Sequence, residues 1–259
     1  MTTRFARIVW FVFGAAAVFF MLSPLLLLVL FSFGRNSLAS FPMRGVTFDW
    51  YRALFANQDF WVAFQNSVVV SLSVGVTSVL VGMLAAFAFA RMKKRRAGPL
   101  LALLTVPLMM PPLVLALALF SAYAALHIPL SVWTVVPGQV VFIQPFVILV
   151  VYARMADFDE SVIDSARDLG ASPMRAFLTV TLPIIRPTVI GAALIAMALS
   201  LDEFIITYYT IGGGLTLPTL VWGMLRRSLD PSINALATLI LIGTLGATML
   251  AIRATRYRG

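Results

Sequence analysis

Two adjacent acids in an apolar stretch, Asp202 and Glu203, are the residues best placed to do chemistry. The chain has no cysteine and a single histidine, His127, which we interpret as an ordinary loop residue. It carries neither a His-Glu-x-x-His metal motif nor the Gly-Lys-Ser/Thr end of a phosphate-binding loop. These observations exclude thiol catalysis, cysteine-ligated metals and ATP hydrolysis by this chain. The chemistry that remains is electrostatic, because paired carboxylates can bind a cation.

The position of the acids predicts a polar route through an apolar environment. A carboxylate at the centre of a bilayer costs about 2.5–3.5 kcal/mol on insertion scales, so such groups usually face water or a partner. Helical spacing places small and polar residues in one stripe with Glu203, and this stripe predicts a wall of a translocation pathway. The stripe comprises Ala193, Ala196, Ser200, Glu203 and Thr207. Asp202 lies beside the stripe. Two interpretations stay open: an anionic site for a cationic solute, or a structural pair against a second membrane subunit.

Long uncharged runs must position these acids. Apolar residues make up 61% of the chain and charged residues 11%, with a mean hydropathy of +0.99, which is typical of an integral membrane protein. A helix needs about 20 apolar residues to cross a bilayer. We therefore predict an all-α protein with six transmembrane helices, at 8–33, 66–90, 99–125, 133–153, 188–209 and 232–252. Prolines inside the third and fourth of these predict bent helices, which either line the pathway or shape the packing.

Basic residues predict the orientation of the spans. The N-terminus, the C-terminus and the segments 91–98 and 154–187 hold 14 of the 19 Lys and Arg residues. Both termini are therefore expected in the cytoplasm. The basic turn at 91–96 is interpreted as a topology anchor facing anionic lipid, rather than as a nucleic-acid site. The first apolar run is too long for a cleaved signal, so we expect an uncleaved span.

Two segments between the expected spans carry further local signals. Residues 49–55 are rich in aromatic side chains, which favours a short helix on the outer membrane surface. The apolar segment 211–233 is expected to fold back against the outer mouth of the bundle. Asp230 and Pro231 then supply an N-cap and a first-turn proline for the last span.

The polar segment 154–187 predicts two short helices with a turn between them. The first runs over 161–169 and ends at Gly170, where a left-handed residue is favoured. Ser172 and Pro173 begin the second as N-cap and first position, and prolines at 183 and 187 close it. Met174, Phe177 and Leu178 share one face of the second helix, which predicts burial against a soluble partner subunit.

This segment resembles the cytoplasmic coupling loop of type I ABC importer permeases. In that family Glu-Ala-Ala is followed by a glycine and a downstream Leu-Pro. Here the corresponding residues are Asp164, Ser165 and Ala166, then Gly170, then Leu182 and Pro183. The resemblance implies a coupling helix seated on an ATPase, with Met174 and Phe177 at the same contact, and ATP and Mg bound by that partner and no cofactor in this chain.

The resemblance also implies an organisation and a set of partners. It predicts a first helix and loop start in 1–45, a permease core in 46–252 and a cytoplasmic tail in 253–259. The expected partners are a homologous second permease subunit, two ATP-binding subunits, an extracytoplasmic solute-binding protein and lipid of the bacterial inner membrane, with no nucleic acid.

The solute is suggested by a narrower resemblance. Segments 200–204, 217–226 and 232–238 resemble the spermidine/putrescine importer permeases, which carry paired acids at the first of these places, and this implies a polyamine or related amine as the solute. Together with the stripe, it gives Ser200, Asp202, Glu203 and Thr207 as the expected pathway residues. Those permeases tend to carry an acid after a Met-Pro in the third span, where this chain has Met110-Pro111-Pro112. The alternatives are an amino-acid derivative, a phosphonate, or an ion-coupled secondary transporter in which the acids carry protons.

Overall fold

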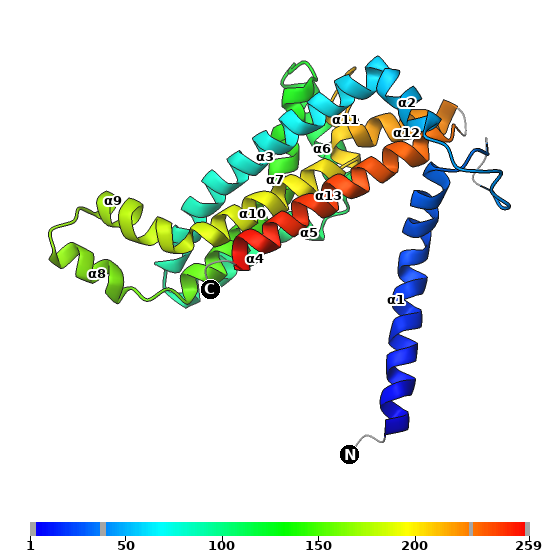
Figure 1. Ribbon diagram of the computed structural model, residues 1–259. Helices are drawn as coiled ribbons and strands as arrows, with labels where there is room; N and C mark the ends of the chain where they lie inside the picture. The colour runs from blue at the N-terminus through cyan, green and yellow to red at the C-terminus, as the bar shows by residue number, and fades with distance from the viewer. Residues whose placement is uncertain (1–3, 37–39, 228–229, 257–259) are drawn as a thin grey trace. The chain divides into compact units, whose positions relative to one another are not determined.

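The computed structural model describes residues 4–36, 40–227 and 230–256, and these are helical almost throughout (Figure 1). Its chain divides into two compact units, Met1–Phe60 with Val221–Leu241 and Trp61–Leu220 with Ile242–Gly259. The helical elements are α1 Arg4–Ser32, α2 Asp49–Ala56, α3 Gln58–Ala90, α4 Lys94–Leu104, α5 Val106–Met109, α6 Pro112–Ala125, α7 Val132–Ala156, α8 Ser161–Asp168, α9 Pro173–Ala176, the π-helix η1 Phe177–Thr181, α10 Leu182–Asp202, α11 Ile205–Thr210, α12 Leu217–Arg227 and α13 Ser232–Arg256. The predicted boundary at residue 45 does not coincide with either unit and stays a prediction.

In the first unit, aromatic side chains join the end of α1 to α2. The Trp50 indole donates a hydrogen bond to the carbonyl of Gly34 at 2.7 Å, and the hydroxyls of Ser32 and Tyr51 lie 2.8 Å apart. The ring of Phe33 packs against Tyr51, with centroids 5.3 Å apart. The predicted short aromatic helix is confirmed as α2, and its place on a membrane surface stays a prediction.

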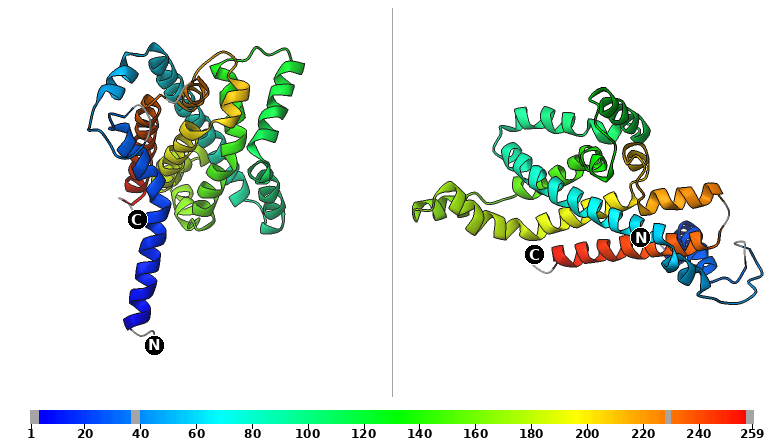
Figure 2. Two further views of the ribbon diagram at one scale, coloured as in Figure 1. Left: turned by 90° about the vertical axis from the view of Figure 1, so that its right-hand side faces the viewer. Right: turned by 90° about the horizontal axis from the view of Figure 1, so that it is seen from above.

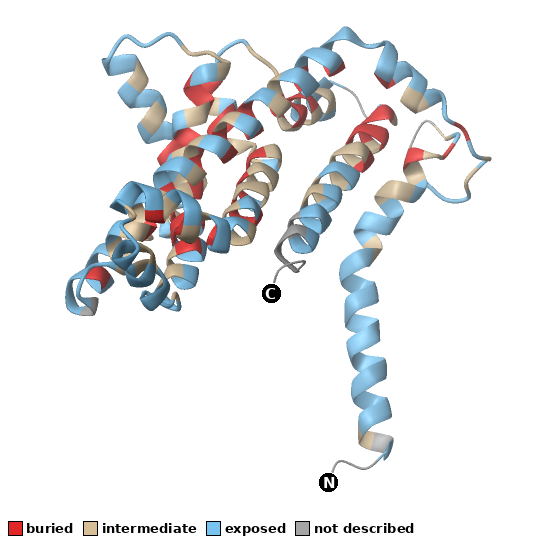
Figure 3. Ribbon diagram, turned by 60° about the vertical axis from the view of Figure 1, so that its left-hand side comes forward, coloured by how far each residue is buried: buried red, intermediate tan, exposed pale blue. Residues whose placement is uncertain are grey.

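Most apolar side chains of α1 are exposed within the described part of the first unit. Residues 7–22 are all exposed, and Figure 3 shows α1 in the colour of exposed residues over most of its length. A helix that is hydrophobic all round and exposed in this way is suited to lipid or to a partner in the bilayer.

The core of the second unit lies between α3, α7 and α10. Its buried residues include Val74 of α3, Ile143 of α7 and Ala196 of α10. Glycine allows α3 and α10 to approach closely, because a Cβ added at Gly75 would lie 2.6 Å from Cγ of Met197. Small residues at close helix contacts are typical of membrane proteins.

The predicted third span is not one straight helix. It is divided into α4, α5 and α6, and the chain is extended at Met110 and Pro111, with ψ of 137° and 130° (Figure 2). A proline pushes the residue before it out of the α region, so the pair Pro111-Pro112 interrupts the helix. Bending of this span is confirmed, whereas α7 runs unbroken through both of its prolines.

Five helices in the described part of the chain are long and apolar enough to cross a membrane. The third predicted crossing, which is not among these five, corresponds to the broken α4–α6 segment. Its last piece, α6, has 14 residues and so spans about 21 Å, less than the roughly 30 Å of a bilayer core. The count of six spans therefore stays a prediction.

The predicted fifth span was wrong at both ends. The helical run begins at Pro173 and ends at Asp202, rather than covering 188–209, and α11 follows as a separate helix. Glu203 between them has an extended backbone, with φ of −74° and ψ of 109°. The acids therefore lie at a break between two helices instead of in the middle of one.

The segment before α12 is tied to α3, as a segment that folds back requires. The Asn66 side-chain amide donates to the carbonyl of Leu215 at 2.8 Å, and Ser67 Oγ accepts from the backbone N–H of Leu217 at 2.8 Å. Its location at an outer mouth stays a prediction. The cap of the last span is confirmed, since a carboxylate oxygen of Asp230 accepts from the N–H of Ser232 at 2.9 Å.

Candidate functional site

The first helix of the predicted coupling loop is confirmed as α8, and the predicted left-handed glycine at its end is confirmed as well. The Ser161 N–H donates to a carboxylate oxygen of Asp159 at 3.0 Å, and hydrogen bonds from Ser161 lower the pKa of that carboxyl. At the other end Gly170 has a φ of +85°. The N–H of Gly170 donates to Arg167 O and that of Ala171 to Ala166 O, at 2.9 and 3.1 Å. This pair of bonds is a Schellman motif, in which glycine is favoured.

The second helix begins as predicted but does not end as predicted. Ser172 Oγ accepts from the N–H of Arg175 at 3.3 Å, and Pro173 occupies the first turn. The chain then widens into η1 and continues as α10 through Pro183 and Pro187, which were expected to close the helix. The N–H of Leu182 donates to Phe177 O in the wide register of a π turn. Pro183 has no backbone N–H to donate, and it comes directly after this change in hydrogen-bond register.

The residues matched to the Glu-Ala-Ala pattern lie along α8. Asp164 is exposed and lines a pocket, and Ser165 donates through its hydroxyl to the carbonyl of Ser161 at 2.8 Å. Ala166 is half-buried, and its carbonyl takes part in the Schellman motif. Ser165 and Ala166 thus take part in hydrogen bonds of α8 and its C-terminal cap, whereas Asp164 stays accessible.

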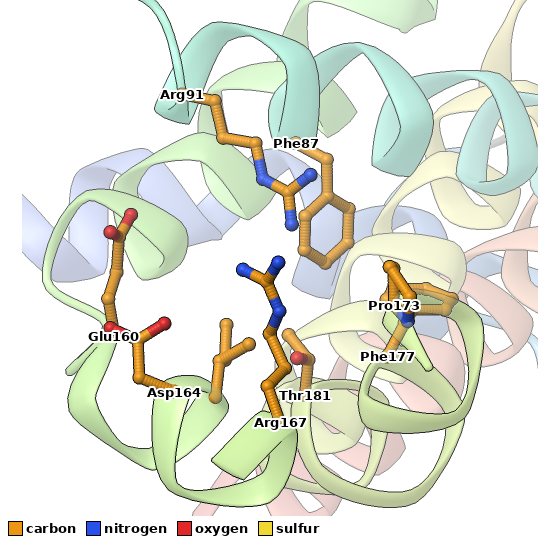
Figure 4. A pocket seen from close by; sticks show the side chains of 9 residues that line it. Phe87, Arg91, Glu160, Asp164, Arg167, Pro173, Phe177 and Thr181 are labelled. Atoms are coloured by element: carbon orange, nitrogen blue, oxygen red, sulfur yellow. The ribbon is translucent and has the colours of Figure 1, made fainter. Parts of the chain in front are cut away.

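A cavity of 330 Å³ separates α8 from the end of α3 (Figure 4). Arg91, which directly follows α3, and Arg167 of α8 point into it from opposite sides, while Glu160 and Asp164 lie along another edge. Arg91 belongs to the basic turn that was interpreted from the sequence only as a topology anchor.

The face predicted for a soluble partner is shared with the chain itself. Phe177 is half-buried, and its ring meets Phe87 of α3 edge-on, with centroids 5.0 Å apart. Met174 and Leu178 remain exposed, Met174 at 66%. Docking of this face on a partner stays a prediction, and Phe177 in addition anchors the second helix to α3. The most exposed apolar side chain of the loop is Leu169, at 90%, in the turn that precedes Gly170.

The acids occupy the helix break with different roles. Glu203 is half-buried, and its Oε1 accepts from the N–H of Ile206 at 2.7 Å, so it caps the start of α11. Asp202 is exposed at the last residue of α10. Neither carboxylate pairs with Lys or Arg within the described ranges.

A buried glutamine missed by the sequence analysis bridges this break. Gln139 of α7 is 1% exposed, and its Nε2 donates to Thr207 Oγ1 at 2.8 Å. Its Oε1 accepts from the hydroxyl of Ser200. The only available sequence signal was an amide side chain within an apolar span.

The predicted stripe of small and polar residues does not lie on one helix, which corrects the sequence prediction. Ala196, Ser200 and Thr207 are buried, and both hydroxyls bond Gln139 within the chain. Because α10 stops at Asp202, the five residues do not follow one continuous helix. A pathway role for Ser200 and Thr207 stays a prediction, whereas Asp202 has the exposure that such a role needs.

Comparison with known proteins identifies the family. The family described as "Binding-protein-dependent transport system inner membrane component" matches residues 78–259. The chain is similar to the putrescine transport system permease protein PotI of Escherichia coli, 33% identical over 254 residues that cover 92% of this chain and 89% of that protein. It is also similar to the spermidine/putrescine transport system permease protein PotC of Haemophilus influenzae, 27% identical with 90% and 91% covered.

Solved structures agree on the fold. A bacterial ABC transporter involved in import of the acidic polysaccharide alginate gives a TM-score of 0.71 at 14% identity, with 98% of both chains covered. The MetNI methionine ABC transporter gives 0.59 at 15% identity, covering 77% of this chain and 97% of that one. The family match decides against the ion-coupled secondary transporter. The chain belongs to the inner membrane components of binding-protein-dependent transport systems and is a permease subunit of an ABC importer.

Proposed function

We propose that this permease forms half of the import pathway for a small cationic solute of the polyamine class. The observation that carries the proposal is the acid pair at the break between α10 and α11. Asp202 is exposed there without a basic partner in the described part of the chain, and Glu203 is half-buried beside it. Apolar surroundings strengthen the attraction between such carboxylates and an ammonium group. The putrescine and spermidine permeases among the relatives point to the same solute class.

In the proposed assembly a homologous permease subunit supplies the other half of the pathway. Two ATP-binding subunits hydrolyse ATP with Mg, and an extracytoplasmic binding protein delivers the solute. Fourteen of the 19 basic residues fall in segments on one side of the predicted spans, which supports cytoplasmic termini and a cytoplasmic α8–α9 segment.

The α8–α9 segment is proposed as the contact with an ATP-binding subunit. Its exposed apolar residues include Leu169, at 90%, and Met174, at 66%, and burial against a partner would remove these side chains from water. Closure of the ATP-binding subunits would move this segment, and α10 would carry the motion to the acids because the helical run from Pro173 to Asp202 is continuous. Such a change is a rigid-body switch between two states.

The solute class is tested with the paired variant Asp202→Asn and Glu203→Gln in the assembled transporter. Glu203→Gln retains a side-chain oxygen that can accept from the Ile206 N–H, so the pair removes charge while it preserves the α11 cap. We expect putrescine uptake to be lost while the transporter assembles normally. Unchanged putrescine uptake would remove the acids from the mechanism, and uptake only of an amino-acid derivative or a phosphonate by the unsubstituted transporter would overturn the polyamine assignment.

A further inference from the structure

We infer that Gln139 is a positioning residue that sets the geometry of the acid break, and this inference rests on the proposed role of the acids in solute binding. Gln139 lies on α7, outside the segment that carries the acids. Its side chain contacts the last turn of α10 through Ser200 and the first turn of α11 through Thr207. One amide thus connects the two helices on either side of Asp202 and Glu203.

The donor directions form one ordered chain of hydrogen bonds. The Ser200 hydroxyl donates to Gln139 Oε1, which orients the amide so that Nε2 donates to Thr207 Oγ1 at 2.8 Å. The Thr207 hydroxyl in turn donates to the backbone carbonyl of Glu203 at 2.8 Å. The chain of bonds therefore ends on the backbone of one of the two acids.

Burial makes this arrangement hard to replace. Gln139, Ser200 and Thr207 are all at most 5% exposed, so water has little access to any group that loses its partner. An unpaired buried polar group is costly, which favours the single geometry in which all these bonds form. Closing or widening the break would move Ser200 relative to Thr207 and would strain the bridge that Gln139 makes between them.

A second glutamine on the same helix provides a matched comparison. Gln144 of α7 donates through Nε2 to the carbonyl of Ser78 on α3, at 3.1 Å, rather than to either helix at the break. Its Oε1 is buried without a hydrogen-bond partner. Removal of Gln144 therefore perturbs α7 packing without disturbing the acids.

The first test measures the break directly in the full assembled transporter. Because the natural chain has no cysteine, Asp202→Cys introduces a single thiol at the break. The rate at which a positively charged methanethiosulfonate reagent modifies this thiol is measured in three proteins. These are Asp202→Cys alone, Asp202→Cys with Gln139→Leu, and Asp202→Cys with Gln144→Leu. We expect Gln139→Leu to change the rate roughly tenfold, the effect of losing a buried hydrogen bond or two, and Gln144→Leu to leave it unchanged.

The second test separates positioning from stability, with both acids kept in place. Gln139→Leu and Thr207→Val should raise the half-saturating concentration of putrescine roughly tenfold, whereas Thr207→Ser, which keeps the hydroxyl, should retain the wild-type value. Gln144→Leu should alter only the amount of transporter.

The outcomes distinguish this inference from the proposed solute class. An unchanged modification rate in the Gln139→Leu background would overturn the positioning role whatever the solute is. A changed rate in that background, combined with a wild-type transporter that does not import putrescine, would support the positioning role and reject the polyamine assignment.

Discussion

The ring of Phe177 meets the ring of Phe87 edge-on, with centroids 5.0 Å apart and an interplanar angle of 81°. This contact joins the second helix of the coupling segment to the end of α3, far from it in sequence. The adjoining Arg91 lines the same pocket. The proposed motion of the α8–α9 segment would therefore reach α3 as well as α10.

The aromatic contact predicts a non-additive pair of variants. Edge-to-face pairs contribute about 0.5–1.5 kcal/mol beyond their buried area. Phe87→Leu and Phe177→Leu should each lower the solute imported per ATP hydrolysed, and the double variant should be no worse than either one. Fully additive losses, measured in proteoliposomes, would show that the two rings act independently.

A residue at position 170 that cannot adopt the backbone conformation of Gly170 should uncouple ATP hydrolysis from solute uptake. Proline fixes φ near −65°, against the observed +85°, and it also removes the N–H that bonds Arg167 O. Gly170→Pro should therefore leave ATP hydrolysis measurable while uptake falls by an order of magnitude or more. Gly170→Asn is the control, because asparagine tolerates the left-handed region and should keep most of the coupling. Normal coupling in the proline variant would contradict the docking assignment.

Two substitutions at Glu203 should separate the effect of losing its charge from the effect of losing the cap of α11. Glu203→Gln keeps an acceptor for the Ile206 N–H, whereas Glu203→Ala removes it. Losing an N-terminal cap costs about 1 kcal/mol. In thermal unfolding of the purified transporter, Glu203→Ala should be less stable than Glu203→Gln, while both impair uptake of a cationic solute. Equal stability of the two variants would show that the cap contributes nothing.

Local signals in the sequence were sufficient to predict α8 and the start of the helix that follows it. Gly170, Ser172 and Pro173 act through bonds to residues within five positions, so their roles follow from short-range chemistry. The same local rule failed at Pro183, because a π turn before it allows the helix to continue. Proline rules describe where a donor is missing, and the surrounding structure decides whether its absence ends a helix.

The site around the acids depends on contacts that the sequence does not encode locally. Gln139 and Ser200 are 61 positions apart, and no periodic pattern pairs them. The break at Glu203 was missed because the stripe from Ala193 to Thr207 fits a regular helix. Membrane composition, most span locations and the acids themselves were predictable because they depend on residue type, whereas the partner of each polar group depends on tertiary packing.

Docking of the α8–α9 segment on an ATP-binding subunit should protect its exposed side chains from modification. Leu169→Cys places a unique thiol on a side chain that is 90% exposed in this chain, and Leu126→Cys is a matched control at 69%. Maleimide labelling of each is compared with and without the ATP-binding subunits. We expect protection at residue 169 and none at 126, and equal labelling of residue 169 in both preparations would contradict docking through this segment.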